Sequence, residues 1–223
     1  MNRRAFNRYF IYLTGVVFLS AGITLNTKTN LGVASLIALP YTSSEIWGLS
    51  FPLMTFLMYV LFIVLQLILK RKNRQIKDLL QIPLSMAFSL LLDIFGRGYD
   101  EAVDMFDLDL GLSMRFALLF VAIIMTGVGV SMMIAMELVP NPADGLAEAV
   151  GTAFKKGLGF GKNFIDISSV AITCAMGLIF RGHVVGVGIG TVISMIAVGR
   201  SIAVFNHFFL KKMRRAVEGC EDI

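Results

Sequence analysis

The sequence is poor in charged residues. Asp, Glu, Lys and Arg make up 16% of its 223 residues, and hydrophobic residues make up 57%. Soluble domains carry about 25% charged residues and about 45–50% apolar ones. A chain with so little charge cannot cover an ordinary soluble globule with polar side chains. The composition therefore indicates an integral membrane protein.

Cysteine and histidine are scarce as well, with two of each. Cys174 lies within a long apolar run and Cys220 lies in a polar tail, so we expect no disulfide between them. His183 and His207 lie at opposite ends of one predicted helix, which leaves no Cys/His cluster for a metal. No pairing of a nucleophile with a base is recognisable. We therefore predict no metal site, no cofactor and no enzymatic activity.

The net charge of +5 does not indicate nucleic-acid binding, because Lys and Arg fall in short clusters between apolar runs. The aromatic residues are mostly Phe inside those runs, without the interleaving of basic and aromatic residues that RNA or DNA binding favours. Short basic clusters beside apolar runs are typical of cytoplasmic anchors at a bilayer. The lipid bilayer is thus the expected partner, and nucleic acid is not.

Long apolar runs are what the sequence has in abundance. About 20 apolar residues are needed to cross a bilayer as a helix. Six runs are long enough: residues 9–25, 51–69, 79–95, 116–136, 161–180 and 184–205. Apolar stretches within 26–46 and 137–156 are too short to cross and have polar residues at their edges. We expect an all-α membrane protein with six transmembrane helices and two short re-entrant segments.

The basic clusters predict an orientation for these spans. They lie at residues 1–8, 70–77, 155–156 and 211–215, whereas residues 96–111 are strongly acidic. Loops rich in Lys and Arg stay on the cytoplasmic side of a membrane. Six spans place every basic cluster inside, with both termini cytoplasmic. In that arrangement residues 96–114 form an acidic outer loop and residues 209–223 form a cytoplasmic tail. The expected location is a bacterial cytoplasmic (inner) membrane.

The chain also resembles itself. "GLSFP" at 48–52 matches "GLGFG" at 157–161, and Ser85-Met86 matches Ser194-Met195 in the same register. The order of long span, short segment, long span, long span occurs twice, in residues 1–95 and 115–208. Because three crossings separate the two units, the second must be inverted relative to the first. Many secondary transporters have this plan, and discontinuous helices at matching positions then mark their substrate site.

Several polar residues are expected in the cytoplasmic half of the membrane, where an ionisable side chain costs at least about 2.5–3.5 kcal/mol and needs a reason. They are Asn141, Asp144, Glu148, Asp166 and Arg200. One interpretation is an ion pair of Arg200 with Asp144 or Asp166 that only locks helix packing. The other is a site that binds a substrate or couples to protons. The sequence leaves both open.

A weaker group lies near the outer side. Lys28 follows the first span and Asp93 ends the third, so they could pair across the first short segment or extend separately to the interface. Asn26 and Asn30 could donate hydrogen bonds to an anionic ligand or cap helix ends.

Three stretches carry a family resemblance: "TNLGVASLIAL", "LVPNPADGLAEAV" and "VGVGIGTVISMIAVGRSIAVF". They resemble the YczE/YyaS/YitT-type bacterial integral membrane proteins. In that family the first short segment often reads "LGVGPWDVL", and here Ser35-Leu36-Ile37 replaces its Pro-Trp-Asp. The second half keeps Pro142-Ala143-Asp144. The resemblance implies a multi-span protein of the bacterial inner membrane and suggests transport.

These observations lead to a small secondary transporter or exporter of a small polar solute, coupled to protons or another ion. Alternating access would come from movement of one inverted repeat against the other. Two alternatives stay open: a non-transporting assembly or anchoring partner, and a substrate-capture subunit of a larger transporter. A chain this small could also act as a homodimer.

Overall fold

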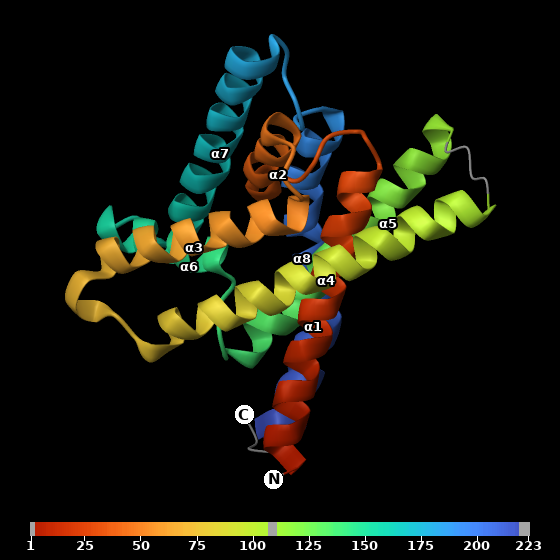
Figure 1. Cartoon of the computed structure of the whole chain (residues 1–223). Helices are drawn as coiled ribbons and strands as arrows, with labels where there is room; N and C mark the ends of the chain where they lie inside the picture. The colour runs from red at the N-terminus through yellow and green to blue at the C-terminus, as the bar shows by residue number, and fades with distance from the viewer. Residues whose placement is uncertain (1–2, 107–110, 219–223) are drawn as a thin grey trace.

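A computed structural model describes residues 3–106 and 111–218; the acidic residues 107–110 and Cys220 lie outside the described part. The described residues form α-helices joined by short connections, with one 3-10 turn at Arg71–Asn73 (Figure 1). The helices are α1 (Arg3–Lys28), α2 (Ser35–Trp47), α3 (Phe51–Lys70), α4 (Ile76–Phe106), α5 (Leu112–Met136), α6 (Pro142–Ala153), α7 (Gly157–Arg181) and α8 (Ile189–Glu218).

Six of these helices are long and apolar enough to cross a membrane, as predicted: α1, α3, α4, α5, α7 and α8. Helices α2 and α6 coincide with the two expected short segments. Two ends differ from the prediction. Helix α4 continues through residues 96–106, which were expected to be loop, because Asp93 pairs with Arg97 one turn later and Lys28 of α1 pairs with Asp100. Helix α8 likewise continues into the expected tail.

Three of the four basic clusters, at residues 1–8, 70–77 and 211–215, meet at one end of the bundle, the basic end, where α1 begins and α5 and α8 finish. The Arg8 side chain donates to the Met136 carbonyl at 2.8 Å, and Lys77 donates to the Glu137 carbonyl at 3.0 Å. Arg214 lies 3.5 Å from the Glu137 carboxylate. These cations are favourable there because a helix C-terminus carries partial negative charge. The start of α1 and the end of α8 both lie at this end (Figure 1).

Helices α1 and α5 cross closely through small residues. A Cβ on Gly22 would lie 2.7 Å from the Thr126 backbone nitrogen, and one on Gly129 would lie 2.5 Å from that of Leu19. In lipid, helices associate largely through such close backbone packing, since burial of apolar surface does not favour the interior over the bilayer. The crossing holds together the first long helix of each half of the chain.

Both short helices lie between α3 and α7. Helix α6 sits so close to α7 that a Cβ on Gly161 would overlap the Ala147 carbonyl. The start of α2 is fixed by the connection between α7 and α8, where the Val33 N–H donates to the Gly186 carbonyl at 2.9 Å and the Gly190 N–H donates to the Leu31 carbonyl at 2.7 Å. This packing determines where the two short helices begin.

Candidate substrate site between the two short helices

The two short helices begin with the same backbone geometry. The residue before α2, Ala34, has φ −58° and ψ 144°, and the residue before α6, Asn141, has φ −59° and ψ 141°. The first N–H groups of a helix lack partners within the helix and need capping. Asn141 caps its own helix, since its Oδ1 accepts from the Ala143 N–H at 3.0 Å. At α2 the Ala34 N–H instead donates to Oδ1 of Asn26 at 2.9 Å.

Both helix starts lie near the middle of long helices. The Ser35 hydroxyl, in the first turn of α2, donates to Asp166 Oδ1 at 2.7 Å, and Asp166 lies near the middle of α7. Asn141 Nδ2 donates to the hydroxyl of Tyr59 at 3.4 Å, near the middle of α3. The N-termini of α2 and α6 therefore meet the long helices well inside the apolar region.

A cavity of about 280 Å³, the central cavity, lies between these two helix starts. Most of its polar lining comes from the beginnings of α2 and α6 and from α7: Ser35, Asn141, Asp144, Lys162, Asn163 and Asp166. Helices α1, α3, α5 and α8 supply the largely apolar remainder, including Leu19, Tyr59, Val130 and Val198. The composition fits a ligand site, in which a few polar groups are fixed against apolar walls.

The charged centre of this cavity consists of two carboxylates and one ammonium group. Lys162 Nζ lies 3.2 Å from Asp144 Oδ1, and the two side chains are 41% and 25% exposed. Asp166 also lies within electrostatic range of Lys162. One cation between two carboxylates leaves an excess of one negative charge when both are ionised. Such a centre can accept a further cation or a proton.

A second cavity of about 520 Å³ lies between the central cavity and the basic end. Both cavities are lined by Asn141, Asp144 and Lys162, so these side chains form the boundary between them. The far part of the second cavity is lined by Lys77 and Glu137, which belong to the basic end. The Asp144–Lys162 pair therefore lies where a solute from the basic end would reach the centre of the protein.

The structure brings together three of the predicted site residues, Asn141, Asp144 and Asp166, and places others elsewhere. Glu148 is exposed and lines only the second of these two cavities. The expected pairing of Arg200 with Asp144 or Asp166 is corrected: Asp144 pairs with Lys162. Arg200 is exposed and, within the described residues, lines neither cavity.

Asn26, expected to bind an anion or cap a helix, is buried and structural. Besides accepting from Ala34, it donates through Nδ2 to Ser194 Oγ at 3.1 Å and so connects α1, α2 and α8. Asn30 is exposed, with a positive φ of 56° in the connection after α1. Of the two alternatives for the outer residues, a Lys28–Asp93 pair does not form: Lys28 pairs with Asp100 at 2.6 Å, and Asp93 pairs with Arg97 at 2.8 Å.

Sequence reasoning missed Lys162, although the residue precedes Asp166 by four positions and so shares its helix face. It also missed a buried polar cluster between α3 and α4. There Asp78 accepts from Gln66 Nε2 at 2.6 Å, from Lys70 Nζ at 2.8 Å and from the Gln75 N–H at 2.9 Å. Because these three donors satisfy the Asp78 carboxylate, we interpret this cluster as structural: it stabilises the connection between α3 and α4.

Fold and site together define a multi-pass helical membrane protein in which two half-length helices begin at a shared charged cavity. The model of a family of unknown function, DUF6198, matches residues 6–207, and the chain belongs to that family. No curated protein and no solved structure matches it. The resemblance to YczE/YyaS/YitT-type proteins stays a prediction.

Proposed function

We propose that the protein is a small secondary transporter or exporter of a polar solute, coupled to protons or another ion. The observation that carries this proposal is the Asp144–Lys162–Asp166 centre, held inside the apolar region between the starts of two short helices. Ionisable groups at such depth are costly and mark ion and substrate pathways in many membrane proteins. Discontinuous helices that begin at a mid-membrane site are the usual binding elements of secondary transporters.

The two halves, α1–α4 and α5–α8, act in this proposal as inverted repeats. Each has the order long, short, long, long, and each short helix packs against the third helix of the other half. The short helices begin with the same backbone geometry and run in opposite senses. Helix α6 leads from the central cavity towards the basic end, whereas α2 ends where the Glu45 carbonyl accepts from Arg181, at the finish of α7. Opposed short helices support inversion.

In the proposed cycle, Lys162 neutralises Asp144 when no solute is bound. A cationic group or a proton that reaches the centre through the second cavity competes with Lys162 for the carboxylates. Rocking of one repeat against the other then exposes the centre to the opposite end. The apolar walls exclude water from the charged groups, and a low dielectric strengthens each interaction there. The carboxylates Asp144 and Asp166 bind the cation or proton, and Lys162 returns when it leaves.

The proposed location is a bacterial cytoplasmic membrane with both termini on the cytoplasmic side. Its test is a single cysteine at Asp104, on α4 near the acidic segment, in a background of Cys174→Ser and Cys220→Ser. An impermeant maleimide added to whole cells should label this cysteine. Labelling only after the cells are opened would place the basic end outside and refute the orientation.

Transport is tested with the purified protein in liposomes and pooled amines, amino acids and organic acids, with and without a pH gradient. We expect uptake of at least one solute class and its near-complete loss in Asp144→Asn. Asp104→Asn is the matched control, since Asp104 is exposed and lines neither the central cavity nor the second cavity. If no solute moves or raises the melting temperature, or if Asp144→Asn transports normally, the proposal fails and an assembly role gains support.

A further inference from the structure

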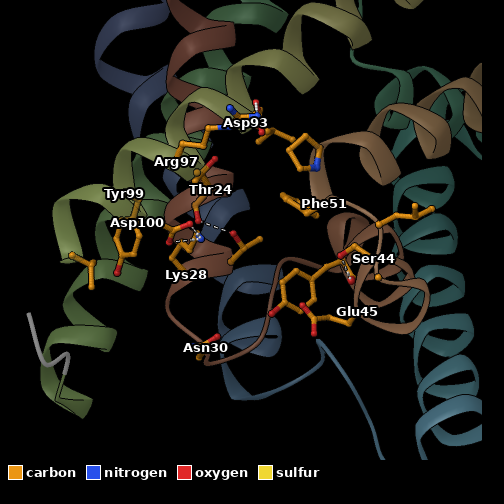
Figure 2. A pocket seen from close by; sticks show the side chains of 18 residues that line it. Thr24, Lys28, Asn30, Ser44, Glu45, Phe51, Asp93, Arg97, Tyr99 and Asp100 are labelled. Carbon is orange, nitrogen blue, oxygen red and sulfur yellow. Dashed lines mark hydrogen bonds and ion pairs between the residues drawn. The ribbon is translucent and has the colours of Figure 1, made fainter. Parts of the chain in front are cut away.

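A third cavity, the vestibule, lies at the opposite end of the bundle from the basic end. It has a volume of about 730 Å³ and is lined by residues of α1, α2 and α4 and by the start of α3 (Figure 2). The vestibule and the central cavity have no lining residue in common. It is therefore a separate compartment with its own chemistry, and the proposed transport centre does not account for it.

The vestibule is negatively charged overall. Its lining has the carboxylates of Glu45, Asp93 and Asp100 against the cations of Lys28 and Arg97. Two of the carboxylates are already paired, Asp100 with Lys28 and Asp93 with Arg97, as Figure 2 shows at the α1–α4 wall. Glu45 remains as the excess negative charge. Helices α1 and α2 also end at this cavity, and helix C-termini add partial negative charge.

A buried hydroxyl points independently to a ligand. Three Thr and Ser side chains from α1 and α2 line the vestibule, and two are satisfied locally: Thr27 donates to the Thr24 carbonyl and Ser44 donates to the Tyr41 carbonyl. Thr24 is only 3% exposed, and its own Oγ1 has no hydrogen-bond partner in the described part of the chain. A buried polar group without a partner is costly. A ligand N–H group in the vestibule would supply the missing partner.

The vestibule also has an aromatic wall. The rings of Tyr41 and Phe51 lie edge to face with centroids 6.0 Å apart, and both residues line the cavity. Aromatic faces attract organic cations through their negative electrostatic potential. Excess negative charge, an unpartnered buried hydroxyl and aromatic faces together favour an organic cation that carries N–H donors.

We propose that the vestibule is a binding site for small primary ammonium compounds, in which Glu45 supplies the countercharge, Thr24 accepts an N–H hydrogen bond and Tyr41 and Phe51 hold the alkyl part. Lys28 and Arg97 act as internal competitors, because each occupies a carboxylate that the ligand could use. The proposal does not depend on transport through the central cavity.

The test is equilibrium binding of n-butylammonium to the full chain in nanodiscs, by calorimetry, with butyrate and tetraethylammonium as comparison probes. All variants carry Asp144→Asn, so that the central carboxylate is removed and a failure here is separate from a failure of transport. We expect n-butylammonium to bind and butyrate not to bind. Tetraethylammonium, which has no N–H donor, should bind more weakly.

Among the variants, Glu45→Gln and Thr24→Val should each weaken n-butylammonium binding about tenfold, the loss expected for one charge-assisted hydrogen bond. Thr24→Ser keeps the hydroxyl and should bind as the parent does, which separates loss of the ligand contact from a folding defect. Lys28→Gln should strengthen binding severalfold by freeing Asp100. Asp104→Asn removes one negative charge, as Glu45→Gln does, but on α4 outside the cavity, and should have no effect.

Three results would overturn the proposal. One is the absence of n-butylammonium binding in the parent protein. Another is binding that neither Glu45→Gln nor Thr24→Val weakens, since the ammonium would then lie elsewhere. The third is preferential binding of butyrate that Lys28→Gln abolishes, which would make the vestibule an anion site.

Discussion

The two short helices, α2 and α6, begin alike and are supported differently. Helix α6 carries its own cap, Asn141, and its own carboxylate, Asp144. Helix α2 has neither: Asn26 of α1 binds the N–H of its N-cap residue, and the carboxylate at its first turn is Asp166 of α7. The charged centre therefore comes entirely from the second half of the chain, from α6 and α7, while the first half contributes hydroxyl groups from Ser35 and Tyr59.

The starts of the two short helices thus have similar backbone geometry but different functional roles. Helix α6 presents a titratable group of its own, Asp144, whereas α2 supplies a hydrogen-bond donor, Ser35, to the Asp166 carboxylate of α7. The position of Asp144 in α6 corresponds to Ile37 in α2 when the helix starts are superposed in sequence, and Ile37 is 2% exposed in the apolar core. A carboxylate at that position of α2 would be buried without a cation of its own.

The largest expected effect comes from disrupting the close packing of α6 against α7 at Gly161. A Cβ at Gly161 would overlap the Ala147 carbonyl and lie 2.8 Å from the Gly151 backbone nitrogen, so no side-chain rotation can relieve the clash in Gly161→Ala. Overpacking costs about 1–3 kcal/mol and sometimes more, and a backbone clash belongs at the upper end. We expect a clear fall in the melting temperature in detergent.

Gly159→Ala is the matched control for this change. It lies on the same helix two residues earlier, and a Cβ there meets no atom within 4 Å. Alanine is favoured over glycine within a helix by up to about 1 kcal/mol, so the melting temperature should stay the same or rise. Equal destabilisation by both substitutions would show that α6 does not depend on this close approach.

The next effect compares the two asparagines at the helix starts, Asn26 beside α2 and Asn141 at α6. Asn26→Ala removes the acceptor of the Ala34 N–H and the donor to Ser194 at a buried position, and each buried group left unpaired costs about 1–3 kcal/mol. Asn141→Ala removes an ordinary N-cap, worth about 1 kcal/mol. We expect Asn26→Ala to lower the free energy of unfolding more than Asn141→Ala, as measured by chemical denaturation. The reverse order would mean that α2 does not depend on α1 for its start.

Much of this arrangement was accessible from the sequence. Long apolar runs predicted the spans, because only apolar side chains are favourable against lipid. Asp144 and Asp166 were found because an ionisable residue is conspicuous in an apolar run. The contacts of Arg8, Lys77 and Arg214 with the end of α5 bring the N-terminal, 70–77 and 211–215 basic clusters to one end of the bundle, whereas the orientation of that end in a membrane stays a prediction.

The sequence could not predict which charged side chains pair with Asp144 and the other ionisable residues, for a physical reason. In lipid both the outer and the inner faces of a helix are apolar, so hydropathy does not fix how a helix is rotated about its axis. Arg200 was therefore expected to face the carboxylates and is instead exposed, while Lys162 forms the ion pair. The helical conformation of residues 96–106 was not predicted for a similar reason. Asp100 forms its ion pair with Lys28, which is distant in sequence.

The smallest effect concerns Ser35, the first residue of α2, where α6 has Pro142. Proline suits the first position of a helix, and the residue before it must be extended, as Ala34 is with ψ 144°. Ser35→Pro should therefore destabilise the protein no more than Ser35→Ala, each by about 1 kcal/mol through loss of the hydrogen bond to Asp166. Ala38→Pro is the control, because it removes the backbone bond to the Ala34 carbonyl and should cost about 3 kcal/mol. If Ser35→Pro costs as much as Ala38→Pro in chemical denaturation, the two short helices do not share the same start, and the proposed repeat loses its best local support.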